Sequence, residues 1–153
     1  MNYLLRGKYL EDFVVGDVFF TPARTVSEAD VCAFACLTGD FNPLHMNEEW
    51  AKEHSVFKTR IGHGMFGVAL ISGLINQTGM MEGTTIAVIE THIKFTGPLM
   101  IGDTVVARCT VTEVKPSSKP GRGVLKLDCD LVNQNDDVSV KQEIVLLVKT
   151  RES

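Results

Sequence analysis

The sequence predicts an α+β fold in which a long antiparallel sheet wraps around one buried helix. Residues 64 to 77 are apolar on nearly every side, which is typical of a helix enclosed by its fold. Four long segments in the second half have strand character, and turn residues separate them. The 153 residues suit one domain with one core, and no linker or repeat divides them. We therefore expect residues 1–153 to form a single domain.

A helix is expected to follow Ser27, preceded by a strand over residues 18–25. Ser27 and Asp30 match a capping box, and Gly39 is a typical residue for ending the helix. The residues between them are mostly apolar, which predicts a largely buried helix. Cys32 and Cys36 would then be buried free thiols, because their spacing matches no metal or redox motif.

Two further helices are expected before the sheet. Asn47 is a suitable N-cap for a short helix in which Trp50 and Ala51 would face inward. The central helix is predicted over Gly64 to Gln77. Its glycines lower helix propensity, and they make sense if another backbone has to come close.

Strands are predicted from alternating apolar and polar residues in the second half of the chain. The pattern is clearest where Leu125, Leu127, Cys129 and Leu131 alternate with charged residues. With the segment at residues 18–25, the sheet has five expected strands; the other four are Thr85 to Phe95, Asp103 to Val114, Gly123 to Asn133 and Val138 to Thr150. Edge strands and apolar runs such as Val145 to Val148 need protection, so a homodimer or a multiple of it is expected.

Composition excludes several functional classes. The net charge is −4 without a basic block, which argues against a nucleic-acid surface. The longest apolar stretch is interrupted by glycines and is too short to span a bilayer, and the N-terminus does not resemble a signal peptide. We therefore expect a cytoplasmic protein with no membrane partner and no metal site.

The segment L-T-G-D-F-N-P-L-H at residues 37–45 holds the strongest candidate for chemistry. It places Asp40 and His45 around a turn, and Gly39 and Pro43 make regular helix or strand improbable there. A carboxylate and an imidazole held together can bind one water molecule and move its protons. The alternative is a turn-forming Asp with a structural His. Asn42 is either a pre-proline turn residue or a support for the pair.

A second candidate segment is I-G-H-G-M at residues 61–65, where the central helix begins. The first N–H groups of a helix lack internal partners, so the Gly64 amide could polarise a carbonyl group and stabilise negative charge. The alternative is that Gly64 only permits tight packing. His63 is expected to fix this loop or to line a pocket.

These motifs resemble the signature of the MaoC-like dehydratases, the (R)-specific enoyl-CoA hydratases. The resemblance extends to Y-L-E-D-F at residue 9, T-V-S-E-A-D at residue 25 and P-L-M-I-G-D at residue 98. It implies a hot-dog fold, catalytic roles for Asp40 and His45, and an oxyanion-hole role for the Gly64 amide. It also implies reversible syn-type hydration of a trans-2-enoyl thioester, carried by coenzyme A or acyl carrier protein, with an acyl tunnel near a dimer interface. No metal or redox cofactor is expected, because the thioester supplies the electron sink.

Two other functions remain open at this point, a non-catalytic acyl-CoA-binding protein and an acyl-CoA thioesterase. No Asp or Glu lies between Gly64 and Thr78, whereas several hot-dog thioesterases use an acid on that helix. The sequence leaves open which of Asp40 and His45 is the base, and which acyl chains are accepted. Candidates to meet coenzyme A phosphates are Lys58, Arg60, Lys94, Lys115, Lys119 and Arg122.

Overall fold

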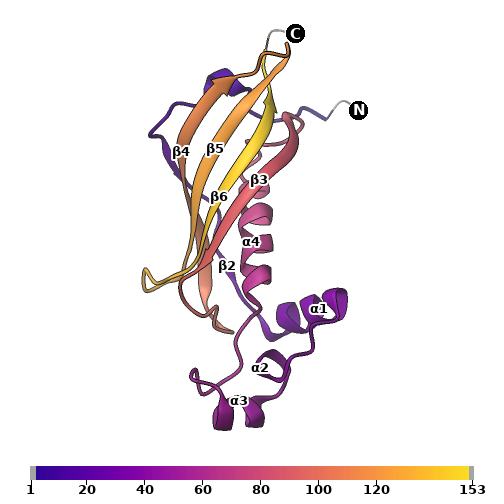
Figure 1. Ribbon diagram of the computed structural model, residues 1–153, viewed down its shortest axis with the longest axis vertical. Coiled ribbons are helices and arrows are strands. Elements are labelled where there is room, and N and C mark those ends of the chain that lie inside the picture. The colour runs from indigo at the N-terminus through magenta and orange to yellow at the C-terminus, as the bar shows by residue number, and fades with distance from the viewer. Residues whose placement is uncertain (1–2, 152–153) are drawn as a thin grey trace.

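The computed structural model describes residues 3–151 and has the expected α+β architecture. A sheet curves around one long helix, and a group of shorter helices lies beyond one end of the sheet (Figure 1). The helices are η1 (Leu10–Asp12), α1 (Glu28–Thr38), α2 (Pro43–Met46), α3 (Glu48–His54) and α4 (Gly64–Gln77). The strands are β1 (Val18–Phe20), β2 (Arg24–Thr25), β3 (Thr85–Phe95), β4 (Thr104–Pro116), β5 (Arg122–Val132) and β6 (Val138–Lys149).

The sheet is antiparallel and has the strand order β1-β4-β5-β6-β3, with β2 also paired to β4. The prediction of one strand over residues 18–25 is wrong in one respect, because this segment forms two short strands, β1 and β2. Pro22 lies between them and has no N–H to donate to a ladder. The described sheet thus has six strands where the sequence predicted five.

The core lies between α4 and the concave face of the sheet. Leu125, Leu127, Cys129 and Leu131 are all buried, as their alternation predicted. α4 begins and ends where it was predicted, and it approaches the sheet closely at Gly67. A Cβ atom on Gly67 would lie 2.8 Å from Val140 Cγ2, so a larger residue there would require the Val140 side chain to shift.

α1 has the predicted boundaries and caps, but the prediction that it is largely buried is wrong. Asp30 N–H donates to Ser27 Oγ at 3.2 Å, and Gly39 ends the helix with a φ of 79°. Only Val31 and Ala35 are buried, while Cys36 is exposed and Cys32 is partly exposed. α1 lies beyond the end of the sheet, which leaves one side of the helix uncovered (Figure 1).

The second short helix is confirmed, with one correction. Asn47 Oδ1 accepts a hydrogen bond from Trp50 N–H at 3.0 Å, as expected of an N-cap. Ala51 is buried, but the Trp50 side chain is 37% exposed and stacks on His54, so its inward orientation was wrong. We call residues 28–54, which carry α1, α2 and α3, the overhang.

An uncovered surface lies along β3, where it is largely apolar, and along the neighbouring side of α4, where small and polar residues predominate. On β3, which is an edge strand, Ile86, Val88 and Ile89 are exposed. The exposed residues of α4 recur at helical spacing and are Met65, Ala69, Ser72, Gly73, Asn76 and Gln77. The apolar run Val145 to Val148 lies instead in β6, between β3 and β5, so it is not an edge that needs covering. No helix in the described part of the chain is long and apolar enough to cross a membrane.

Candidate active site

The two candidate segments meet where the overhang joins α4. Pro43 does not exclude a helix as expected, because it occupies the first turn of α2, where its missing N–H is tolerated. Asn42 is the N-cap of α2, and its Oδ1 accepts a hydrogen bond from Leu44 N–H at 3.0 Å. His45 is therefore carried by a single helical turn whose start is fixed by Asn42.

The hydrogen bonding of His45 determines which ring nitrogen is free. Nδ1 lies 2.8 Å from the carbonyl oxygen of Ile61. A carbonyl oxygen only accepts, so Nδ1 carries a proton and the neutral ring has a bare Nε2. The Ile61 N–H in turn donates to the Leu44 carbonyl oxygen at 3.3 Å, which ties the two segments together. His45 can therefore act as a proton acceptor through Nε2.

Asp40 lies beside His45 and is open to solvent. Its side chain is 54% exposed, and Oδ1 accepts a hydrogen bond from Asn42 N–H at 3.3 Å. This bond is the turn-forming role that the sequence alone suggested, and it leaves the second carboxylate oxygen available. One ligating atom each from Asp40, His45 and His63 lies within 4.8 Å of the others. A single water molecule can span that separation between Asp40 and His45.

His63 contacts both members of this pair. Its side chain is 3% exposed, and Nε2 donates to the Asp40 carbonyl oxygen at 2.9 Å. Its ring stacks on the His45 ring with a centroid separation of 3.8 Å and an interplanar angle of 30°. Phe34 of α1 packs against the same ring at 5.1 Å. His63 thus fixes the Asp40 backbone and the plane of the His45 ring.

The same three side chains are the residue types that could ligate a metal ion. The His63 hydrogen bond argues against this use, because its Nε2 carries a proton directed at the Asp40 carbonyl oxygen. Its Nδ1 is buried and has no partner among the described residues. The arrangement suits a bound water better than a three-ligand metal site.

Gly64 provides a free backbone donor at the start of α4. No described residue accepts a hydrogen bond from its N–H, and the helix dipole adds partial positive charge at this end. Gly64 and His45 both line a cavity of about 620 Å³. The rest of the wall is mainly apolar and includes Phe57, Met65, Phe95, Leu99 and Val140. Such a cavity can accept an acyl chain whose carbonyl group lies at Gly64.

The loop between α3 and α4 is held to the overhang by Arg60. Its guanidinium bonds Glu28 at 2.9 Å and Glu48 at 3.2 Å, so it is already paired and is a poor candidate for phosphate binding. The backbone N–H of Arg60 also donates to Glu48 and, with Thr59, lowers the pKa of that carboxyl group. Sequence reasoning missed this network because its residues are far apart along the chain.

We expect Arg60→Met to lower the Tm at pH 7 and to reduce turnover by loosening the loop. Since the folded-state pKa of Glu48 is lowered, its stabilising effect is present above its unfolded pKa of about 4.3 and is lost as the pH falls below it. The Tm difference between variant and wild type should therefore shrink below about pH 4. Thermal melts from pH 3 to 8 test this, with Lys119→Met, at an exposed lysine outside the Arg60 network, as control. A Tm difference that does not change with pH would contradict the role of the carboxylates.

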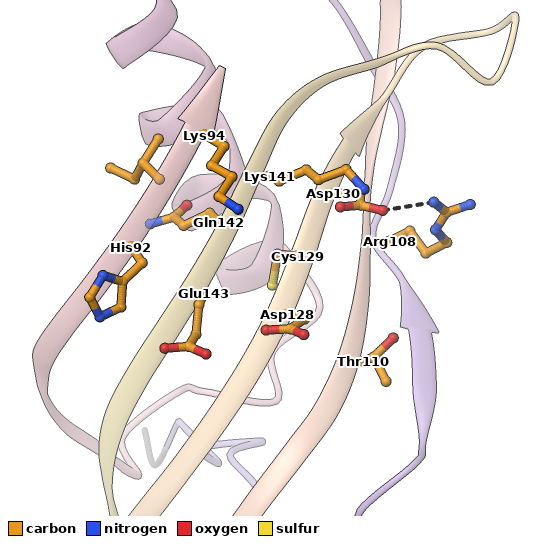
Figure 2. Close-up of a pocket in the computed structure, with 11 residues that line it drawn as sticks. His92, Lys94, Arg108, Thr110, Asp128, Cys129, Asp130, Lys141, Gln142 and Glu143 are labelled. Carbon is orange, nitrogen blue, oxygen red and sulfur yellow. Dashed lines mark hydrogen bonds and ion pairs between the residues drawn. The ribbon is translucent and has the colours of Figure 1, made fainter. Parts of the chain in front are cut away.

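A second cavity, of about 660 Å³, lies on the opposite, outer face of the sheet. Figure 2 shows its charged lining, including Lys94, Lys141 and the ion pair between Arg108 and Asp130 at 2.8 Å. It contains neither a helix N-terminus nor any of the candidate catalytic residues, although Lys94, a candidate for phosphate binding, lines it. Its charged walls are unsuited to an acyl chain, so the apolar cavity at Gly64 is the better candidate for a substrate site.

Comparison with known proteins identifies relatives of the chain. A family model described as a MaoC like domain matches residues 13–133. An (R)-specific enoyl-CoA hydratase from Rhodospirillum rubrum is 40% identical over 111 residues, which is 72% of this chain and 74% of that protein. A 3-hydroxybutyryl-CoA dehydratase from Methylorubrum extorquens is 32% identical over 97% of this chain and 88% of its own length.

The fold is also found among solved structures. A protein from Archaeoglobus described as a monoamine oxidase regulatory protein superposes with a TM-score of 0.87. It is 29% identical to this chain, and the match covers 97% of this chain and 99% of the other. The sheet wrapped around α4, which the sequence predicted, is therefore also the fold of a protein of known structure.

Proposed function

The chain belongs to the MaoC-like family of hydratases and dehydratases, and on that basis we propose that it reversibly hydrates a trans-2-enoyl thioester to the (R)-3-hydroxyacyl thioester. One observation carries the proposal: ligating side-chain atoms of Asp40 and His45 lie within 4.8 Å of each other, and His45, whose Nε2 is bare, lines an apolar cavity. Gly64, whose N–H has no acceptor among the described residues, lines the same cavity. A carboxylate, an imidazole and a carbonyl-binding donor are the groups this reaction needs.

The geometry supports a mechanism in which the thioester carbonyl oxygen accepts a hydrogen bond from the Gly64 N–H. This bond draws electron density from the double bond and makes C3 electrophilic. A water molecule held by Asp40 and His45 adds its oxygen to C3 as one of the pair removes a proton. A proton is then returned to C2 on the same side. Because both groups contact one water, we treat Asp40 and His45 as a coupled pair.

The names of the relatives support a coenzyme A thioester as substrate. One is named for (R)-specific enoyl-CoA hydration and the other for 3-hydroxybutyryl-CoA dehydration, which is the reverse direction. The reaction transfers no electrons, so coenzyme A enters as part of the substrate and we propose no other cofactor. An acyl-carrier-protein thioester remains the alternative carrier.

Product analysis with trans-2-butenoyl-CoA tests the function. Hydration removes the 2,3-double bond and gives the (R)-3-hydroxy product, which chiral chromatography identifies. A thioesterase would release free thiol, and an acyl-CoA-binding protein would do neither. Release of thiol with the double bond intact, or no reaction at all, would refute the proposal.

We further propose that the uncovered surface along β3 and α4 binds a second copy of the chain. Pairing β3 across a two-fold axis would satisfy its free backbone groups and cover Val88, which is 59% exposed. The cavity next to this surface includes exposed Met65 and Phe95, so a partner would help to close it.

We expect the protein to sediment as a dimer or a multiple of it and to lose activity on dilution. Val88→Lys should shift it towards monomer and lower turnover, because a buried charge disfavours the interface. Thr110→Lys, on the outer face of the sheet, is the matched control and should change neither property. Sedimentation and rate measurements over one concentration series make the comparison. A fully active monomer would contradict the interface and leave the proposed chemistry untouched.

A further inference from the structure

Gln142 is a polar residue on the inner, apolar face of the sheet. Gln142 is among the residues around the outer cavity, as are its neighbours Lys141 and Glu143 (Figure 2), but it is only 7% exposed. Side chains alternate along a strand, so Gln142 shares the inner face of β6 with Val140 and Ile144, both of which are buried. An uncharged polar side chain at such a position needs an explanation.

Hydrogen bonding fixes the orientation of the Gln142 amide. The Thr91 hydroxyl donates to the Glu143 carbonyl oxygen at 2.8 Å, so it must accept from Gln142 Nε2, which lies 2.9 Å away. The Oε1 atom is then left buried without a partner among residues 3–151. The amide is therefore tethered to β3, and an acceptor without a donor lies inside the fold.

Gln142 lies one step along the β3–β6 ladder from residues that line the apolar cavity. Phe95 and Val140 are opposite one another in the β3–β6 ladder, and both line the cavity. The next pair on the same face is Ile93 and Gln142, about 7 Å further along the strands. α4 packs directly onto Val140 at Gly67, where a Cβ atom would lie 2.8 Å from Val140 Cγ2.

We propose that Gln142 forms the end wall of the acyl cavity and restricts the substrate to short acyl chains. This inference rests on the proposed function, since it concerns the same cavity. A longer chain would have to move the amide, which would break its hydrogen bond to Thr91. Methylene groups packed against Oε1 would also keep water from an acceptor that they cannot satisfy. Thr91 is the positioning residue that holds this wall in place.

The test compares kcat/KM for trans-2-butenoyl-CoA and trans-2-octenoyl-CoA. The wild type should prefer the four-carbon substrate, and Gln142→Ala should raise the relative kcat/KM of the eight-carbon substrate by roughly 10–200-fold. Thr91→Val keeps the volume but releases the amide, so it should shift the ratio in the same direction. The outward-facing Lys141→Ala is the matched control and should leave the ratio unchanged.

Binding measurements separate this inference from the proposed reaction. Calorimetry with butanoyl-CoA and octanoyl-CoA should show the same wild-type selectivity and the same shifts in Kd, whether or not the protein hydrates an enoyl thioester. If the protein binds butanoyl-CoA selectively but does not hydrate an enoyl thioester, the proposed reaction is refuted and the role of Gln142 as the end wall is retained. A ratio that neither variant changes, or a wild type that already prefers the longer chain, would overturn the role of Gln142. If Gln142→Ala does not fold, Thr91→Val decides the question.

Discussion

Replacing Asp40 by Asn is expected to lower kcat by about 10²–10⁴-fold, the usual range for a general acid–base group. Asn keeps an oxygen that can accept the hydrogen bond from Asn42 N–H, and the side chain is exposed, so the fold should be retained. His45→Gln should have a similar effect, because its amide can still donate to the Ile61 carbonyl oxygen but cannot exchange a proton. Steady-state kinetics and melting curves on the same samples test both variants.

The double variant of Asp40 and His45 should be hardly worse than the poorer single variant, because groups that act on one water molecule are not additive. His54→Gln is the matched control. His54 is an exposed histidine of α3 that stacks on Trp50, and its replacement should leave kcat unchanged. Near wild-type turnover in either single variant would show that the assigned pair is wrong.

The second large effect is expected at Gly64, where two variants together isolate the backbone donor. Gly64→Pro removes the N–H and should lower kcat by about 10²–10³-fold, as the loss of an oxyanion-hole donor does. A proline is tolerated at the first helical position. Its Cβ, however, would lie 2.7 Å from Phe95 Cε1, so the ring of Phe95 has to move.

Gly64→Ala adds the same Cβ and keeps the N–H, so it is the control for this steric effect. The difference in kcat between the Ala and Pro variants then measures the donor itself. Phe95 is largely exposed and its ring can shift, which makes a folded Ala variant a reasonable expectation. Equal activity in the two variants would exclude the Gly64 amide as the group that polarises the carbonyl.

Local sequence patterns predicted the positions of the helices well, because the interactions that set helix boundaries act between residues close in sequence. The Ser27–Asp30 capping box and Gly39 fixed the limits of α1, and the apolar run fixed α4 from Gly64 to Gln77. Pro43 was misinterpreted for the same reason. It was treated as a residue that breaks helices, whereas at the first position of α2 it favours one.

Burial and strand order depended on contacts that no local pattern reveals. The apolar composition of α1 predicted an enclosed helix, but α1 lies beyond the end of the sheet, and none of the described residues covers one of its sides. His63 showed only as a residue between two glycines, and its stacking on His45 requires residues 18 apart in sequence to meet. The Gln142 amide was missed because a single polar residue in a strand resembles solvent-facing alternation.

The central position of β6 in the sheet has a consequence for the aggregation of the protein. Ile144 to Val148 is an uncharged run of residues with high β-propensity, the composition that favours amyloid-like stacking. Both edges of this run are occupied, by β3 on one side and β5 on the other. Aggregation through it therefore requires β3 to detach first. Anything that holds β3 in place, including the proposed second copy of the chain, should also delay precipitation on heating or storage.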